Sequence, residues 1–215
     1  SDIVRNLMEY MIDRGNSASS VNRRLSALRS FYRFALRRKL IEKDPAHGLQ
    51  GPKKQKPLPQ FLKESEMESL LDSKMWGDSY KGVLERTIII TFYVTGVRLS
   101  ELIGLDDKDI DNITCEIKVT GKRNKQRIIP FGKELAEVFA QYQEVRNTTV
   151  KGDSTAFFQT EKGKRMTTAQ VRSLVKKNLS KVSTLKKRSP HVLRHTFATA
   201  MLNHEAGLES VKKLL

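Results

Sequence analysis

The chain has 215 residues, and its 40 Lys and Arg against 24 Asp and Glu give a formal net charge of +16. An excess of this size indicates a polyanion as partner, because clustered cations neutralise phosphates and release counterions. A hydrophobic content of 38% argues against wholesale disorder, and the lone Cys115 excludes an intramolecular disulfide and a cysteine-built zinc site. No apolar run approaches the ~20 residues that cross a bilayer, so we expect a cytoplasmic protein without membrane contact.

The first two predicted elements are helices, over residues 3–14 and 21–36. The second has one apolar stripe at helical spacing, and no acidic residue lies between positions 23 and 39. The cations around this helix form either a solvated face or, as we favour, a DNA-contacting face, because like charges on one helix repel one another. The candidates for DNA contact here are Arg23, Arg24, Arg29, Arg33 and Arg37.

A proline-rich basic stretch, LQGPKKQKPLPQ, follows at residues 49–60. Its prolines forbid a continuous helix, and its position between two unlike periodic regions favours an interdomain linker over an ordinary surface loop. We therefore predict a helical DNA-binding domain over residues 1–50, a linker over 51–60 and a second domain over 61–215. Lys53, Lys54 and Lys56 of the linker are further candidates for DNA contact.

The second domain is predicted to be helical apart from one β-hairpin. Helices are expected over residues 64–71, 83–94, 133–146, 168–182 and 190–203, with Gly96 ending the second of these. Two alternating β-branched runs, residues 115–120 and 126–130, flank a turn-like segment and predict the hairpin, with Cys115 as a small core residue. The fold class is therefore mainly α with a small antiparallel β-sheet.

Four segments of the second domain stand out: three motifs that carry candidate chemistry, and the terminal residues 207–215. In TGVRLSEL, Arg98 follows a helix stop and opens a short helix, where an anion would be welcome, or else pairs with Glu101 one turn later. In VTGKRNKQR, Lys122 lies in a hairpin loop, where it is either plain surface or a mobile ammonium that reaches a groove. Arg123 and Lys125 of this loop are also candidates for DNA contact.

The third motif, SPHVLRHTFAT, places His191 and Arg194 three residues apart at a helix start. They share one face, so an arginine fork and an imidazole would converge on one phosphate. The alternative is a capping histidine beside a surface arginine. His195 is predicted to be a packing residue.

Together, the order and spacing of these motifs resemble the tyrosine recombinase (phage integrase) family, most closely its Xer-type members, from about residue 17 to 215. The resemblance implies a helical, SAM-like core-binding domain and a catalytic domain. It also implies site-specific recombination, in which a tyrosine attacks a DNA phosphodiester and forms a 3′-phosphotyrosine. Arg98 and Arg194 would hold the phosphate, Lys122 would be the general acid, His191 would handle a proton, and Glu101 would support them.

The same resemblance sets the expected partners. Positioning and charge stabilisation suffice for phosphoryl transfer, so no metal or other cofactor is expected. The partner would be double-stranded DNA, with a recombinase tetramer assembled on it and the protein associated with the nucleoid. The remaining alternatives are a type IB topoisomerase and a non-catalytic architectural or regulatory DNA-binding protein.

In the family, a Gly-His pair and then the nucleophilic tyrosine follow the position of Leu215. The five tyrosines of this chain all precede His191 and none matches the nucleophile. We therefore expect this chain to bind duplex DNA without forming a covalent adduct, and to be mostly monomeric in the absence of DNA.

Overall fold

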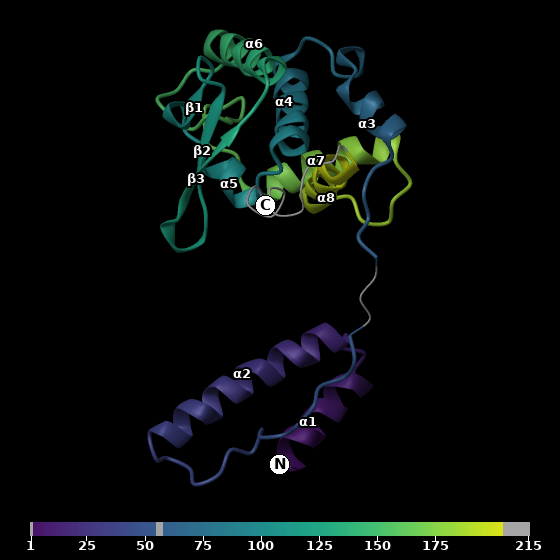
Figure 1. Ribbon diagram of the computed structural model, residues 1–215, viewed down its shortest axis with the longest axis vertical. Coiled ribbons are helices and arrows are strands. Elements are labelled where there is room, and N and C mark those ends of the chain that lie inside the picture. Colours follow the sequence, from purple (N-terminus) through teal and green to yellow (C-terminus); the bar gives the residue numbers. More distant parts are fainter. Residues whose placement is uncertain (1, 55–57, 204–215) are drawn as a thin grey trace. The chain divides into compact units, whose positions relative to one another are not determined.

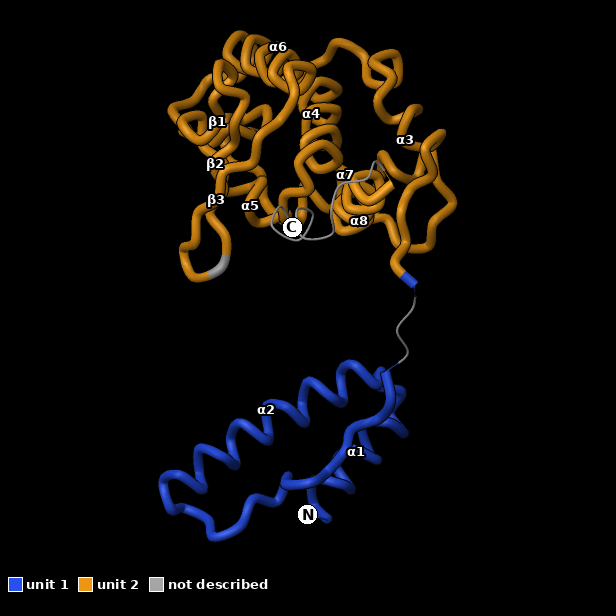
Figure 2. The backbone as a smooth tube through the Cα atoms, in the orientation of Figure 1, with its two compact units in different colours: residues 1–58 blue, residues 59–215 orange. Residues whose placement is uncertain are grey.

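The computed structural model describes residues 2–54 and 58–203, without the side chain of Lys122. The chain divides into two compact units, residues 1–58 and 59–215 (Figure 2). Helices dominate both described parts, and a three-stranded antiparallel sheet lies in the second (Figure 1). The predicted fold class is confirmed.

Unit 1 contains a pair of packed helices, α1 (Asp2–Asp13) and α2 (Ala18–Arg37). α2 begins where the hydroxyl of Ser17 accepts a hydrogen bond from the Ser20 N–H at 3.2 Å, which satisfies one of the free donors of a helix start. The chain after α2 returns along it, because Asn22 donates to the Pro52 carbonyl at 2.8 Å. The small apolar core between the helices consists of Val4, Met8, Met11, Val21, Leu25 and Leu49.

Helix α4 (Tyr80–Thr95) is the central element of unit 2 (Figure 1). It is buried along most of its length, although it carries three threonines. The hydroxyls of Thr87, Thr91 and Thr95 each donate to the carbonyl one turn earlier, so no polar group of theirs is left unsatisfied inside the core. The helices in contact with α4 are α3 (Glu64–Leu71), α6 (Lys133–Thr149), α7 (Thr168–Val182) and α8 (Pro190–Asn203).

The sheet of unit 2 has the order β1-β2-β3, and both pairs are antiparallel. Successive side chains along each strand point to opposite faces of the sheet, and Ile117, Val119 and Ile129 are buried on its inward face. In the β2–β3 register Val119 lies opposite Arg127, so Arg127 shares the inward face. The strands are β1 (Ile110–Asp111), β2 (Glu116–Thr120) and β3 (Gln126–Pro130), and single turns of 3₁₀ helix occur at Ser73–Met75, Asp107–Asp109 and Lys122–Asn124.

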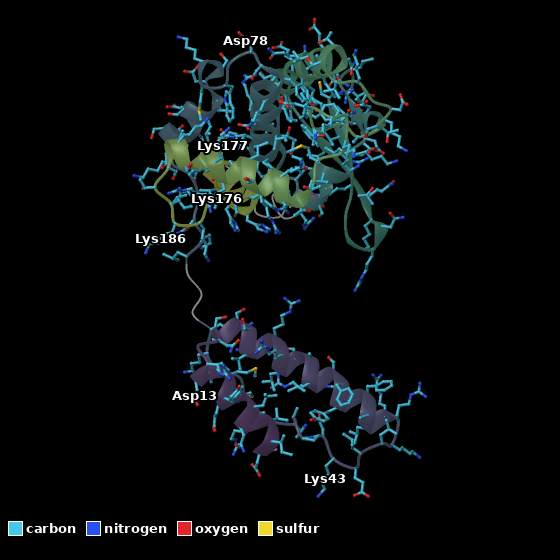
Figure 3. The ribbon with its side chains drawn as sticks, turned by 180° about the vertical axis from the view of Figure 1, so that it is seen from behind. Asp13, Lys43, Asp78, Lys176, Lys177 and Lys186 are labelled. Atoms are coloured by element: carbon cyan, nitrogen blue, oxygen red, sulfur yellow. The ribbon has the colours of Figure 1, made fainter. Side chains whose placement is uncertain are left out.

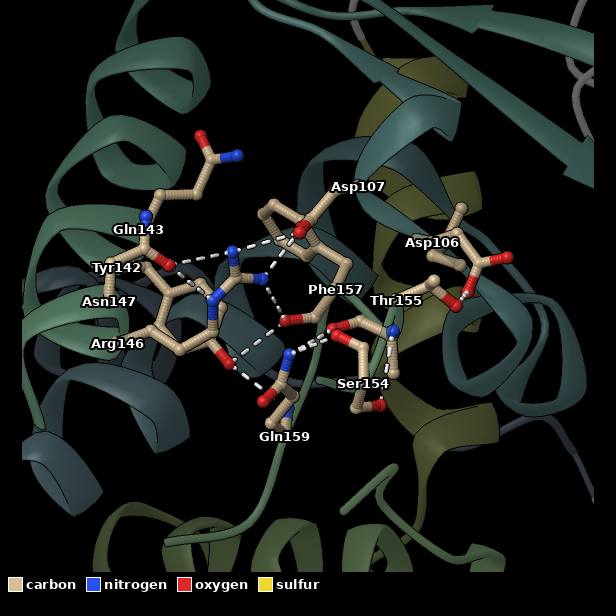
Figure 4. A network of polar contacts seen from close by, with 12 residues as sticks. Asp106, Asp107, Tyr142, Gln143, Arg146, Asn147, Ser154, Thr155, Phe157 and Gln159 are labelled. Carbon is tan, nitrogen blue, oxygen red and sulfur yellow. Dashed lines mark hydrogen bonds and ion pairs between the residues drawn. The ribbon is translucent and has the colours of Figure 1, made fainter. Parts of the chain in front are cut away.

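A buried arginine joins α6 to the segment before α7 (Figure 4). Arg146 is 5% exposed and forms two hydrogen bonds with the carboxylate of Asp107, at 2.6 and 3.0 Å. It also donates to the Phe157 carbonyl at 2.9 Å, beside the ring of Tyr142. Because the bidentate partner and the carbonyl satisfy this guanidinium, its charge is tolerated within the aromatic core.

Two residues differ from the sequence-based predictions, and one large aromatic side chain belongs to the core. Cys115 is half-buried in the turn before β2 with φ 55°, so its prediction as a strand core residue is wrong. His195 is exposed, so its prediction as a packing residue is also wrong. Trp76 is 8% exposed and its indole N–H donates to the Leu70 carbonyl at 3.0 Å, which makes it a core residue of unit 2.

Candidate active site

Arg98 stands between two helices because Gly96 ends α4. Gly96 adopts a left-handed conformation with φ 59°, which costs glycine little, and Arg98 is the N-cap of α5 (Leu99–Gly104). The Arg98 side chain donates to Glu101 at 2.9 Å, so the ion pair considered in the sequence is present. The side chain nevertheless keeps 47% of its surface exposed, which leaves its guanidinium accessible to an anion.

Glu101 is the centre of a small ionic cluster. Its side chain is 1% exposed and accepts hydrogen bonds from the Arg98 N–H at 2.8 Å and from two nitrogens of Arg127 at 2.6 and 3.0 Å. Burial alone would raise the pKa of Glu101, but the hydrogen bonds from Arg127 and Arg98 outweigh it and lower the pKa to about 2. The carboxylate is therefore ionised throughout the physiological range.

Arg194 reaches the same place from α8. Its guanidinium donates to the carbonyl of Gly96, two positions before Arg98 in the chain. Burial, and then the nearby charge of Arg98, lower the pKa of Arg194 to about 10. The structure thus brings Arg98 and Arg194 together from segments far apart in the sequence.

His191 lies one turn before Arg194, in the first turn of α8, and its side chain is exposed. The start of α8 is fixed to the beginning of unit 2, because the Leu62 N–H donates to the hydroxyl of Thr196 at 2.9 Å. His191 and Arg194 therefore share a helix that is held in place at its first turns.

Lys122 follows Gly121 in the loop between β2 and β3, and its side chain lies outside the described part of the structure. The loop is a tight turn, in which the Gly121 N–H donates to the Lys125 carbonyl at 2.8 Å and Arg123 and Asn124 have φ of 60° and 57°. Gly121 packs against Glu101: a Cβ on this glycine would lie 3.3 Å from a carboxylate oxygen. The loop of Lys122 therefore begins beside the Arg98 cluster.

Arg127 was missed as a functional candidate in the sequence. Its signal was its place on the inward face of β3, where a charged side chain needs a buried partner. The partner could not be identified, since Glu101 lies on a different element.

Among the candidate DNA-contact residues that the structure describes, all but Arg29 are exposed. Arg29 is half-buried and donates to the Leu49 carbonyl. Lys56 lies outside the described residues. The exposed members are Arg23, Arg24, Arg33, Arg37, Lys53, Lys54, Arg123 and Lys125.

Further exposed cations lie on α7 and after it. Lys176, Lys177 and Lys186 are labelled in the rear view of unit 2 (Figure 3). Lys177 pairs with the buried carboxylate of Glu85 at 3.3 Å, so part of this charge is locally balanced. The terminal segment 207–215, which the sequence also singled out, lies outside the described residues.

Two of the tyrosines, Tyr80 and Tyr142, are buried in the core of unit 2 and form hydrogen bonds there. The hydroxyls of Tyr80 and Tyr142 donate to the carbonyls of Gln159 and Phe157. Burial raises the pKa of both phenols, which opposes use of either as a nucleophile. Over residues 2–54 and 58–203, no cluster of three His, Cys, Asp or Glu is arranged for a metal ion, and no helix is long and apolar enough to span a membrane.

Comparison with known proteins identifies the protein family to which this chain is similar. Residues 60–215 match the phage integrase family, and residues 1–39 match its N-terminal SAM-like domain. The tyrosine recombinase XerC of Chlorobaculum tepidum is 35% identical over 99% of this chain and 69% of its own length. The tyrosine recombinase XerD of Staphylococcus saprophyticus is 36% identical over 99% of this chain and 72% of its own length.

Solved structures show the same fold. The XerA recombinase superposes with a TM-score of 0.65 at 24% identity, over 100% of this chain and 73% of that one. The XerH recombinase, bound to a palindromic difH substrate in a post-cleavage complex, gives 0.82 at 21% identity, over 99% of this chain and 65% of that one. The chain belongs to the phage integrase family, as a Xer-type tyrosine recombinase, an enzyme class that breaks and rejoins DNA in site-specific recombination.

Proposed function

We propose that this protein binds duplex DNA and that Arg98 and Arg194 hold the scissile phosphate between them. The observation that carries the proposal is the burial of Arg194 beside Arg98, which lowers the pKa of Arg194. Two guanidinium groups kept together against their repulsion form a site that an anion stabilises, and each guanidinium can donate two parallel bonds to phosphate oxygens.

The remaining roles follow from the chemistry of strand cleavage. The tyrosine oxygen forms a bond to phosphorus as the bond to the 5′ oxygen breaks, and negative charge grows on the non-bridging oxygens. Arg98 and Arg194 stabilise that charge, Lys122 gives a proton to the leaving 5′ oxygen, and His191 takes up the proton that the tyrosine hydroxyl loses. Glu101 orients Arg98 and does not itself exchange protons, since its pKa is about 2.

The two units divide the work in this proposal. Residues 1–50 form a core-binding domain whose helix α2 contacts the DNA backbone, residues 51–60 form the linker, and residues 61–215 form the catalytic domain. The exposed cations of α2 support the first assignment. The protein would act in the cytoplasm at the nucleoid, where chromosomal DNA lies.

The test compares chemistry with affinity on one DNA duplex. The duplex is first selected from a random pool by binding to this chain, and a nicked version of it is then given to a form of the protein that includes the nucleophilic tyrosine. Arg98→Ala and Arg194→Ala are expected to slow covalent adduct formation by about 10²-fold or more at saturating DNA. Affinity should change only a few-fold, because many other cations share the phosphate contacts.

The control reverses this pattern. Arg33→Ala in α2 should weaken binding and leave the cleavage rate at saturation unchanged. Absence of a covalent adduct with the wild-type protein, together with a loss of affinity in the Arg98 and Arg194 variants, would favour a non-catalytic architectural DNA-binding protein. Relaxation of supercoiled DNA without any strand exchange would favour a topoisomerase.

The proposed assembly is a tetramer formed on DNA. This chain is expected to sediment as a monomer without DNA, and a stable DNA-free tetramer would contradict that expectation. Chromosome dimer resolution and integration of a mobile element use the same chemistry, and the selected duplex would distinguish them by its genomic location.

A further inference from the structure

Arg127 joins the β2–β3 hairpin to the helix of Arg98. From the inward face of β3 it donates two hydrogen bonds to the Glu101 carboxylate, at 2.6 and 3.0 Å. Glu101 belongs to α5, and 22% of the Arg127 side chain is exposed against 1% of its partner. A bidentate contact in this setting fixes both the separation and the angle of the two elements.

The position of Arg127 matters because of what the hairpin carries. Gly121, the residue before Lys122, packs against the same carboxylate, with an added Cβ expected 3.3 Å from it. The loop between Gly121 and Lys125 is closed by a 2.8 Å backbone hydrogen bond, so it moves with its strands. Any rotation of the hairpin away from Glu101 would carry the backbone of Lys122 with it.

Arg98 is held independently of Arg127. Glu101 accepts from the Arg98 backbone N–H at 2.8 Å and from its guanidinium at 2.9 Å, and both bonds lie within one helical turn. Loss of Arg127 would therefore leave the α5 end of the cluster in place. The consequence should fall on the hairpin and not on the arginines that bind phosphate.

We propose that Arg127 is a positioning residue for the general acid: by clamping β3 onto Glu101, it fixes the loop that carries Lys122 beside Arg98. The inference rests on the proposed function, in which Lys122 protonates the leaving 5′ oxygen. Arg127 itself touches neither DNA nor the reacting atoms in this proposal.

The test replaces the bridging 5′ oxygen of the scissile phosphate by sulfur. A thiolate leaves without a proton, so a sulfur substrate has no need of the general acid, whereas the oxygen substrate does. Arg127→Gln, in a form of the protein that carries the nucleophilic tyrosine, should slow single-turnover cleavage of the oxygen substrate by about 10- to 100-fold, because a misplaced general acid loses part of the roughly 10²- to 10⁴-fold that proton transfer contributes. On the sulfur substrate the loss should shrink to less than about 3-fold, as it should for Lys122→Ala.

Arg165→Gln is the matched control. Arg165 also pairs with a carboxylate, that of Asp106, and it donates to the Ile103 and Leu105 carbonyls at the end of α5, so these hydrogen bonds do not involve the hairpin. Any loss that it causes should be the same for both substrates. Arg127→Lys, which keeps the charge and loses the fork, should lie between wild type and Arg127→Gln, and it carries the test if Arg127→Gln does not fold.

Two results would overturn the inference: an equal loss on oxygen and sulfur substrates, or no loss on the oxygen substrate. Failure of the proposed function looks different, because the wild-type protein would then form no covalent adduct on either substrate. If the wild-type protein cleaves, but Arg127→Gln is slowed equally on the oxygen and sulfur substrates, the positioning role of Arg127 is rejected and the proposed function is not.

Discussion

Replacing Gly96 by alanine perturbs the point where α4, α5 and α8 meet. Gly96 has φ 59°, and an added Cβ would lie 2.7 Å from one ring carbon of Phe197 and closer still to another. The ring of Phe197 has little room to move, because this residue is 6% exposed. The backbone of Gly96 is also restrained, because its carbonyl accepts a hydrogen bond from the Arg194 guanidinium. The substitution therefore combines backbone strain with overpacking.

The magnitude follows from these two parts. A left-handed conformation costs a non-glycine residue roughly 1–2 kcal/mol, and overpacking costs roughly 1–3 kcal/mol. The smaller entropy of the unfolded alanine chain offsets roughly 0.4–1 kcal/mol of this. We expect Gly96→Ala to lower the free energy of unfolding of unit 2 by about 1–4.5 kcal/mol.

Gly77→Ala separates the two parts. Gly77 has φ 69°, and nothing lies within 4 Å of its added Cβ, so this variant carries the backbone strain alone. Urea unfolding followed by the fluorescence of Trp76, the single tryptophan, reports on unit 2 specifically. Gly96→Ala should unfold at clearly lower urea than Gly77→Ala, and Phe197→Leu should offset part of the difference.

Equal destabilisation by Gly96→Ala and Gly77→Ala would refute the reasoning, because it would mean that Phe197 yields without cost. In that event the register of α8 on α4 would not depend on Gly96. Arg194 would then owe its position to contacts elsewhere on α8.

Three further predictions concern other parts of the molecule. The pKa of Glu101 is about 2, below the ordinary 4.5, so its ion pairs stabilise the fold fully above about pH 4.5 and lose this effect as the pH falls towards 2. Relative to Glu101→Gln, the wild-type protein should lose about 3 kcal/mol of unfolding free energy over that range. Parallel pH profiles of the two proteins would contradict this. Arg146→Leu leaves the Asp107 carboxylate without its two hydrogen bonds from the guanidinium, while the Phe157 carbonyl keeps its hydrogen bond from the Tyr142 hydroxyl. Unit 2 should therefore lose roughly 2 kcal/mol in the same urea assay, and a loss under about 0.5 kcal/mol would show the ion pair to be dispensable. Arg33→Ala should reduce the slope of log affinity for duplex DNA against log salt by about 1, whereas an unchanged slope would remove α2 from the DNA interface.

Local signals predicted most of the secondary structure because they act over a few residues. The apolar stripe of α2 and the stop at Gly96 both appear in the structure. The strand prediction was wrong at Cys115, which has a left-handed backbone conformation in the turn before β2. The alternation of apolar and polar residues does not reveal such a turn, because Cys115 continues the pattern of the strand. The helix boundaries also shifted, as α4 begins at Tyr80 behind the Ser79 cap.

The candidate site was predicted only as far as motif spacing reaches. Arg98 and Arg194 could be named from the sequence, and the structure places them together through the Gly96 carbonyl. The cross-element pair of Arg127 with Glu101 depends on how a strand packs against a helix, which spacing along one chain does not encode. The predicted roles of these residues in cleavage stay predictions until the variants are measured.

The threonines of α4 have a consequence for how unit 2 tolerates change. The hydroxyls of Thr87, Thr91 and Thr95 each donate to a carbonyl of α4 itself, so they need no hydrogen-bond partner from the surrounding helices. Neighbouring helices need supply only apolar volume of suitable shape at these positions. Hydrophobic repacking is therefore tolerated around these three threonines, whereas the buried Arg146 and Glu85 each need their polar partners.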